Sequence, residues 1–222
     1  EGNISQVLVN SFEVYDNSGA PPLEPVLTLS ATEATYTGLN HVSVDVDLAG
    51  YTLESVGTLA MDSDYTVEGL GADRIKITFE PDYLNAIIHG QSDTLDLTFT
   101  KAGEANEVRE FLVSAALTQP SLPDTATIAK NSNAEITASY GAYPTIVSIK
   151  QGEQLLSAGN EYTISGSVIT LDSSLFSGLS SGDSLAFTVT FHRDGQSETT
   201  KTTVVYIEAF DAPSMGYATM ND

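Results

Sequence analysis

The sequence predicts an all-β protein that consists of two tandem β-sandwich modules with an extra N-terminal strand. Two observations support this prediction: short alternating or β-branched segments recur along the chain, and the series of segments occurs twice. In HVSVDVDL, Val42, Val44 and Val46 alternate with polar residues, as in a sheet with one buried and one solvated face. Further strands are expected at VLTLSAT (26–32), RIKITF (74–79), TLDLTFT (94–100) and EVREFLVSA (107–115), and in the second half at TATIAK, AEITASY, TIVSIK, SVITL, SLAFTVTF and TKTTVVYIEAF.

The second half repeats the residue order of the first. Tyr65-Thr66 corresponds to Tyr162-Thr163, and after a glycine turn Ile77-Thr78-Phe79 corresponds to Ile169-Thr170-Leu171. The first copy has about five extra residues, 70–74, which we expect to lengthen the turn between two strands.

Each copy also contains an apolar cluster with helical spacing. In the first copy Tyr83, Leu84 and Ile87 follow Pro81, and in the second copy the segment DSSLFSGL at 172–179 has the same spacing. We therefore expect one short helical turn in each copy. About seven short strands and glycine-marked turns in each copy fit an immunoglobulin-like sandwich.

The segment TQPSLPD at 118–124 separates the two copies, because its prolines interrupt strand pairing. The segment SQVLVNSFEVYD has no counterpart in the second copy, and its Val7, Val9, Phe12 and Val14 predict an interaction strand that joins a sheet edge of this chain or of a neighbouring copy. The predicted organisation is an N-terminal extension with a strand and a Pro-rich hinge (1–24), a first immunoglobulin-like module (25–118), a linker (119–123), a second module (124–210) and a C-terminal tail (211–222).

The chain is strongly acidic. Thirty Asp and Glu against eight Lys and Arg give a formal net charge of −22, which argues against nucleic acid and anionic membranes because both need clustered cations. The absence of cysteine excludes disulfides and thiolate metal sites, and no apolar run reaches the roughly 20 residues of a membrane helix. The sequence begins at Glu1 and not at Met, which is compatible with a processed exported protein or with a trimmed chain; we favour processing and expect a protein that is extracellular or at the cell surface.

The second copy, in GEQLLSAGNEYTISGSVITLDSSLFSGLSSGDSLAFTVTF, resembles the immunoglobulin-like X-type ("X two") modules of cellulosomal scaffold proteins and other extracellular bacterial polypeptides. The first copy follows the same pattern through Leu59, Tyr65-Thr66, Gly69, Tyr83-Leu84 and Gly90. The resemblance implies a non-catalytic module that serves as a spacer, a solubiliser or a weak polysaccharide and cell-wall binder. It supplies no catalytic residues.

Two further groups of residues are candidate ligand sites. Asp45 and Asp47, together with Asp62 and Asp64, offer oxygen ligands for calcium, although alternating aspartates also suit a solvated strand face. No other cofactor is expected. The tyrosines of ASYGAYPT, Tyr140 and Tyr143, predict a glycan face, although such tyrosines more often bury their rings and expose only the hydroxyl groups.

The main functional prediction is a non-catalytic, exported structural protein: a subunit of a cell-surface or extracellular filament or sheath, joined to other copies of itself through β-strand edges. The alternative is an accessory module that binds polysaccharide or cell wall, and a further alternative is a virion decoration protein. An enzyme is not expected. GLSSG at 178–182 matches the G-x-S-x-G pattern, but it follows a predicted helical turn and precedes a strand, and the first copy has AIIHG there.

Overall fold

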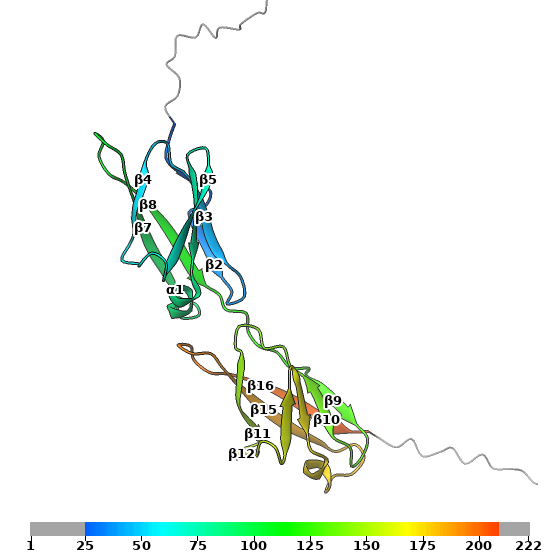
Figure 1. Ribbon diagram of the computed structural model, residues 1–222. Coiled ribbons are helices and arrows are strands. Elements are labelled where there is room, and N and C mark those ends of the chain that lie inside the picture. The colour runs from blue at the N-terminus through cyan, green and yellow to red at the C-terminus, as the bar shows by residue number, and fades with distance from the viewer. Residues whose placement is uncertain (1–24, 209–222) are drawn as a thin grey trace, which may run out of the picture.

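The computed structural model describes residues 25–208, which form sixteen β-strands and two short helices (Figure 1). No helix among these residues is long and apolar enough to span a membrane.

Strands β1 to β8 form a two-layer sandwich, called here the first sandwich. One sheet has the order β1-β3-β6-β5 and the other the order β2-β8-β7-β4. All pairs are antiparallel except β2 with β8, which is parallel. The strands are β1 (Thr28–Leu29), β2 (Glu33–Tyr36), β3 (Val42–Asp47), β4 (Thr52–Val56), β5 (Tyr65–Gly71), β6 (Arg74–Phe79), β7 (Ser92–Thr100) and β8 (Glu107–Ala115).

Strands β9 to β16 form the second sandwich, with sheets β10-β14-β13 and β12-β11-β15-β16-β9. Here β9 runs parallel to β16, as β2 runs parallel to β8. The strands are β9 (Thr125–Ile128), β10 (Ala134–Thr137), β11 (Thr145–Gln151), β12 (Gln154–Leu155), β13 (Tyr162–Ser165), β14 (Val168–Leu171), β15 (Ser184–His192) and β16 (Thr199–Ile207). Two facing, mainly antiparallel sheets are the arrangement of an immunoglobulin-like sandwich, so the predicted all-β class with two tandem sandwiches is confirmed, whereas the extra N-terminal strand lies outside the described residues.

Each sandwich encloses an apolar core between its sheets. In the first, Phe79 of β6 stacks on Phe111 of β8, with ring centroids 5.5 Å apart. In the second, Phe176 meets Phe187 of β15 edge-on at 5.9 Å. All four rings are at most 1% exposed, and burying a side chain of this size contributes about 1.5–3 kcal/mol. The predicted inward face of HVSVDVDL is confirmed, because its valines at 42, 44 and 46 are all buried.

The five extra residues of the first copy lengthen a hairpin, and the expectation of a longer turn is wrong. Strands β5 and β6 pair as far as Gly71 and Arg74, and only Ala72-Asp73 lies between them. Both turn residues have positive φ angles, 47° and 61°, as a tight two-residue hairpin requires. In the second copy the equivalent ladder ends at Ser165 and Val168.

The first strand prediction also needs correction. The segment 26–32 contributes only the two residues of β1, and the chain then crosses to the other sheet as β2. The sequence analysis did not predict β2, whose pairing with Leu112–Ala115 of β8 is a long-range contact.

The two expected helical turns are confirmed. Helix α1 (Pro81–Ala86) has Pro81 in its first turn and buries Tyr83 and Leu84. The 3₁₀ helix η1 (Ser173–Phe176) begins after Asp172, whose side chain accepts a hydrogen bond from the Ser174 amide at 2.9 Å. Both helices close an end of the apolar core.

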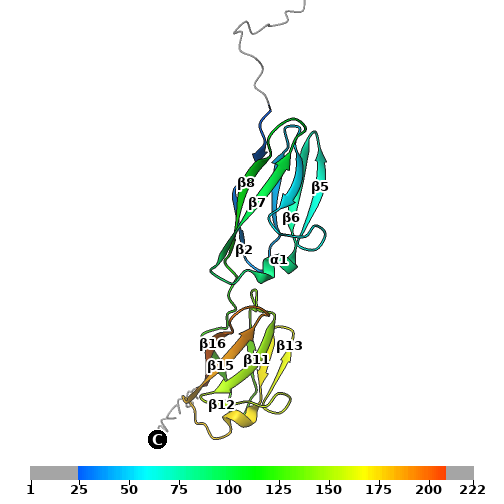
Figure 2. The same ribbon diagram turned by 90° about the vertical axis from the view of Figure 1, so that its left-hand side faces the viewer.

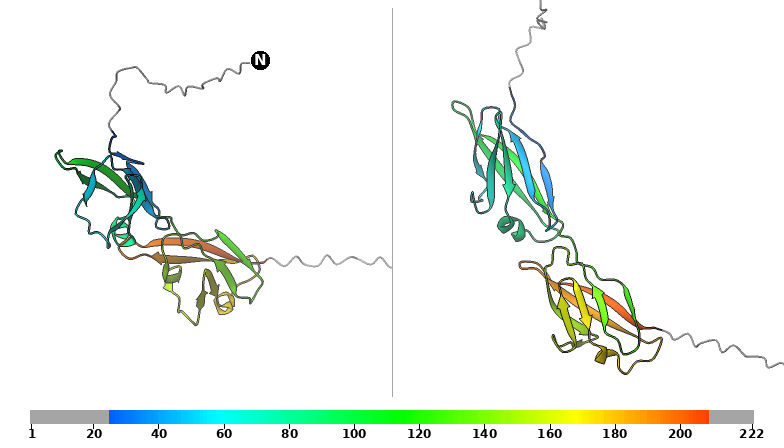
Figure 3. Two further views of the ribbon diagram at one scale, coloured as in Figure 1. Left: turned by 45° about the horizontal axis from the view of Figure 1, so that its top comes forward. Right: turned by 45° about the vertical axis from the view of Figure 1, so that its right-hand side comes forward.

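The β15–β16 hairpin of the second sandwich reaches the end of α1 in the first (Figures 1 and 3). Its Arg193 donates hydrogen bonds to the Tyr36 hydroxyl at 2.9 Å and to Oδ1 of Asn85. Its Gln196 donates to the Ile87 carbonyl at 3.0 Å and accepts from the His89 amide at 2.8 Å. These contacts between residues more than 100 positions apart hold the two sandwiches in one arrangement.

Candidate functional site

The tyrosines of the predicted glycan face do not present open rings. Tyr143 is only 2% exposed, and its hydroxyl lies 3.4 Å from Nε2 of Gln119. Tyr140 is half-buried, with its ring edge-on to Phe191 at 5.8 Å and its hydroxyl bonded to the Gly166 carbonyl at 3.1 Å. Sugar stacking needs an accessible aromatic face. Tyr143 is therefore unavailable for the predicted site, and Tyr140 offers only part of its ring.

The four aspartates considered for calcium separate into two pairs. Asp45 and Asp47 of β3 form ion pairs with Arg74, at 3.5 and 2.8 Å, beside the first residue of β6. Asp62 and Asp64 precede β5, whose first residue pairs with the last residue of β6. The ends of this six-residue strand are about 17 Å apart. The predicted four-aspartate site is thus not assembled, and within residues 25–208 no three His, Asp or Glu side chains are grouped to hold a metal ion.

Two other predictions concern loops and termini. The proposed interaction strand with Val7, Val9, Phe12 and Val14 lies outside the described residues, and so does the tail from 211 to 222. Ser180 of GLSSG lies in the loop between η1 and β15, as expected, where its amide donates to Oδ2 of Asp183 at 2.7 Å.

The outer face of the five-stranded sheet carries a set of hydroxyl side chains that the sequence analysis did not single out. Along β15, Phe187, Val189 and Phe191 are buried in the core, and Thr188 and Thr190 alternate with them on the other face, where Thr188 is half-buried and Thr190 is only 8% exposed. Thr188 lies opposite Thr202 of β16, with the two hydroxyl oxygens 3.2 Å apart. We call this surface the threonine face; its residues are Thr125, Thr127, Ser148, Lys150, Ser184, Ala186, Thr188, Thr200, Thr202, Val204 and Tyr206.

The threonine face differs from the rest of the chain in charge. None of its residues is a carboxylate and Lys150 is its one charged side chain, although the whole chain has a net charge of −22. Tyr206 is the one aromatic residue of the face, and it is 42% exposed. Figure 2 looks onto β15 and β16 of the second sandwich and onto the equivalent β7 and β8 of the first. This surface is hydroxyl-rich and nearly uncharged.

The equivalent face of the first sandwich is chemically different. Asp96 of β7 lies directly opposite Glu110 of β8, at the ladder positions that Thr188 and Thr202 occupy in the second sandwich. Ser114 stands where the second sandwich has Tyr206, each opposite a serine of the neighbouring strand. The first sandwich therefore also has hydroxyl side chains on this face, but an acidic pair interrupts them, whereas the threonine face of the second sandwich carries no carboxylate.

The sequence contains a pattern that could have predicted the threonine face. Threonine occurs at alternate positions in both SLAFTVTF and TKTTVVYIEAF, and alternate residues of a strand share one face. The signal was interpreted only as strand propensity, since threonine is a common strand residue. That the two strands are neighbours, with threonine opposite threonine, depends on the fold.

The strand order defines a chain of two immunoglobulin-like sandwiches. For the second of them, a family model matches the sequence. Residues 123–202 match the family model of carbohydrate binding domain X2. The predicted resemblance to X-type modules is therefore confirmed for the second sandwich. No curated protein sequence matches the chain.

Solved structures with similar chains include glucanases and titin domains. A tri-modular GH5 (subfamily 4) endo-β-1,4-glucanase from Bacillus licheniformis is 18% identical, with a TM-score of 0.33 and coverage of 82% of this chain and 38% of that chain. Domains A168–A170 of titin are 12% identical, with a TM-score of 0.40 and coverage of 82% and 64%. A tri-modular endo-β-1,4-glucanase from Bacillus halodurans is 17% identical, with a TM-score of 0.31 and coverage of 82% and 37%. The chain thus spans less than two fifths of the length of either glucanase, and no activity follows from these likenesses.

Proposed function

We propose that this chain is a non-catalytic, exported carbohydrate-binding region and that the threonine face of the second sandwich contacts polysaccharide. The observation that carries the proposal is the match of residues 123–202 to carbohydrate binding domain X2. Most of the threonine face lies within this range, and Val204 and Tyr206 follow directly after it. The match favours this function over a self-assembling structural subunit, and nothing in the comparisons supports a virion decoration protein.

The chemistry of the face suits a neutral polysaccharide. Each threonine hydroxyl both donates and accepts hydrogen bonds, as sugar hydroxyls do, and its methyl group can pack on the C–H side of a sugar ring. A face without carboxylates also avoids the desolvation cost that a buried charge would impose. Because the surface is one face of a β-sheet and extends over four strands, it fits an extended chain or a packed polysaccharide surface better than a single sugar.

The first sandwich would act as a spacer in this function. We propose that it is a second module of the same X-type family, with module boundaries at about 25–118 and 124–210. The hydrogen bonds of Arg193 and Gln196 support a fixed orientation of the two modules, so that the threonine face is presented at a constant distance from whatever precedes residue 25.

The test is retention of the full chain on insoluble polysaccharide. We expect depletion of the chain from solution by cellulose or by bacterial cell wall. The double variant Thr188→Val/Thr202→Val, which keeps the shape of both side chains and removes the hydroxyls, should reduce the affinity several-fold. Tyr206→Ser should reduce it by about three- to tenfold if the ring packs on sugar.

The matched control is Thr94→Val/Thr98→Val on the first sandwich, where two exposed or half-buried β7 threonines occupy the same kind of face. This control should bind as the unaltered chain does. Failure of the unaltered chain to bind any tested glycan would refute the function, whereas binding that is insensitive to the second-sandwich variants would refute the threonine face alone.

A further inference from the structure

An open groove lies beside β1 at one side of the first sandwich. Its volume is about 660 Å³, and it is lined by residues of β1, the β1–β2 crossing, β7 and β8. Its apolar lining residues include Leu29, Val108 and Leu112, and Val108 is 48% exposed. Arg109 and Glu110 supply its charged groups.

The groove borders a strand edge without a partner among residues 25–208. Strand β8 pairs with β7 along its whole length, but on the other side β2 pairs only with Leu112–Ala115. The Leu112 amide bonds to the Thr32 carbonyl on this side, so the backbone groups of Val108 and Glu110, at alternate positions, face the open edge. The segment from Glu107 to Phe111 is therefore an open strand edge to which an additional strand can pair.

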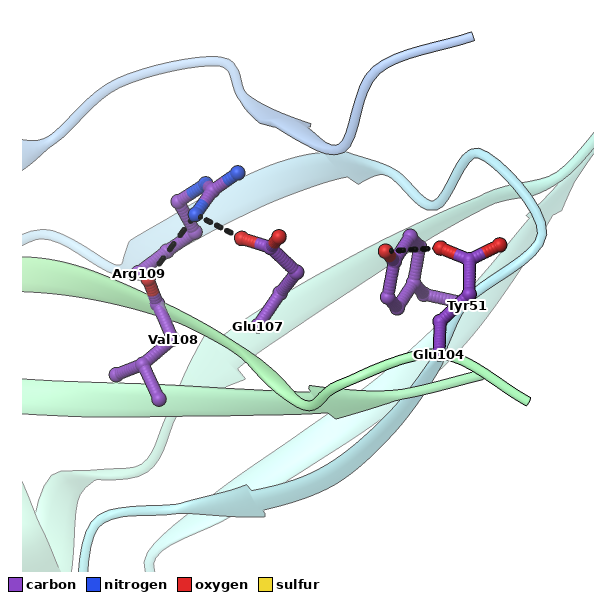
Figure 4. A network of polar contacts seen from close by, with 5 residues as sticks. All are labelled: Tyr51, Glu104, Glu107, Val108 and Arg109. Atoms are coloured by element: carbon purple, nitrogen blue, oxygen red, sulfur yellow. Dashed lines mark hydrogen bonds and ion pairs between the residues drawn. The ribbon is translucent and has the colours of Figure 1, made fainter. Parts of the chain in front are cut away.

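At this edge, a side chain makes one of the hydrogen bonds that a partner strand would make. Arg109 Nη1 donates to the Val108 carbonyl at 3.1 Å and pairs with Oε2 of Glu107 at 2.7 Å (Figure 4). Nearby, Tyr51 donates to Oε2 of Glu104 at 2.7 Å, and this hydrogen bond raises the pKa of Tyr51. The Val108 side chain points away from this polar network.

We propose that residues 5–16 of the same chain bind in this groove as an additional strand on the edge of β8. Strand-forming apolar residues recur in this segment as Val7, Val9, Phe12 and Val14. It has twelve residues, which extend to about 40 Å and exceed the length of the edge. Its Glu13 and Asp16 are its charged side chains, and Arg109 in the groove is a cation for one of them.

The position of the chain entry favours the same chain over a second copy. Leu27, Thr28 and Leu29 line the groove. The described chain, which starts at residue 25, therefore begins beside the groove. Residues 17–25, NSGAPPLEP, are rich in turn formers and can reverse the direction of the chain. Strand β2 runs parallel to β8. A segment that precedes β2 and runs in the opposite direction to it is therefore antiparallel to β8. A tether this short gives an effective concentration on the order of millimolar, above that of a second copy in solution.

Cysteine cross-linking tests the proposal, since the natural chain has no cysteine. The full chain with Val108→Cys is combined in turn with Val7→Cys, Val9→Cys, Phe12→Cys and Val14→Cys, and is oxidised under mild conditions. We expect a disulfide within the monomer for the positions that face Val108, at a rate at least about tenfold above the control pairs. The control pairs use Val147→Cys in place of Val108→Cys. Val147 lies in β11 and is 46% exposed.

Two results would overturn the proposal. Equal rates for the Val108→Cys and Val147→Cys series would show that the segment does not occupy the groove, and disulfide-linked dimers in place of cross-linked monomers would assign the groove to a second copy. Hydrogen exchange in the unaltered chain supplies an independent measurement: the Glu110 amide should be protected at least about tenfold relative to an unstructured amide, and unprotected exchange would contradict an added strand. None of these outcomes depends on carbohydrate binding.

Discussion

The same sheet occurs in both sandwiches with opposite surface chemistry. In the first, Asp96 faces Glu110 across the β7–β8 ladder, and in the second, Thr188 faces Thr202 across β15–β16. Like charges placed directly opposite each other destabilise a sheet, whereas threonine pairs stabilise it by about 0.2–1 kcal/mol. The backbone ladder and the buried residues are maintained in both copies, so the outward positions were free to diverge. The second sandwich has the surface suited to a neutral ligand, and the first has a surface suited to solvent.

The two equivalent hairpins differ in a similar way. In the β15–β16 hairpin Arg193 bonds to Tyr36 and Asn85 of the other sandwich. In the β7–β8 hairpin, Lys101 pairs with Glu104 at 2.8 Å within the same turn and lies 5.0 Å from the centre of the Tyr51 ring. One cation joins two sandwiches, and the other stabilises its own loop.

Replacing these two cations should show the largest difference. Arg193→Ala removes charged hydrogen bonds to partly buried partners and should lower the free energy of unfolding by about 2–3 kcal/mol, whereas Lys101→Ala should cost less than about 1 kcal/mol. Chemical denaturation measures both values. Equal losses would mean that Arg193 does not couple the two sandwiches.

Transferring the acidic pair to the second sandwich should reduce glycan binding. In Thr188→Asp/Thr202→Glu, two carboxylates lie in the proposed contact surface, and we expect an affinity at least about tenfold lower, or about 1.4 kcal/mol. Depletion isotherms on insoluble polysaccharide provide the measurement, with thermal melting to verify the fold. A variant that binds as well as the unaltered chain would place the contact elsewhere.

The reverse replacement should stabilise the first sandwich slightly. Asp96→Thr/Glu110→Thr removes the repulsion across the ladder and should raise the free energy of unfolding by about 0.2–1 kcal/mol. The gain should be larger at low ionic strength, because salt screens exposed charges. Stability that is the same at low and high salt would count against repulsion as its cause. Glycan binding should not change.

The two short helices provide the smallest test, because only η1 has a side-chain cap. Hydrogen bonds from Ser174 hold the pKa of Asp172 below its ordinary value, whereas Glu80 before α1 makes no capping bond. A lowered pKa means that the stabilisation is present above the ordinary pKa of Asp and is lost as the pH falls through the lowered value. Asp172→Ala should therefore lower the melting temperature by a few degrees near neutral pH, and the difference should shrink towards about pH 3. A difference that is independent of pH would exclude the ionised cap.

Local patterns predicted much of the fold and little of the site. The alternation of Val42, Val44 and Val46 correctly gave a buried strand face, and Pro81 correctly marked a helix start. The sequence left open whether Tyr143 is a glycan contact or a buried ring, because a tyrosine in a loop carries no local sign of burial, and the structure shows it buried. Strand β2 was missed because its stability comes from pairing with β8, almost 80 residues later. The aspartates at 45 and 64 lie in strand and turn segments whose separation depends on the pairing of β3, β5 and β6.

By itself, the sequence determined the repeat, the strand character, the acidic charge and the absence of cysteine chemistry. The charge and the absence of cysteine follow from residue types, the strand character follows from a period of two along the chain, and the repeat follows from comparing the two halves. None of them requires knowledge of which segments are neighbours in space. Only the tertiary structure decided that Thr188 faces Thr202, that Arg193 reaches α1 and that the first half of β8 lacks a second neighbouring strand among the described residues. These features depend on which strands become neighbours and in what register, and packing of the two cores fixes that choice after the local pattern has been satisfied.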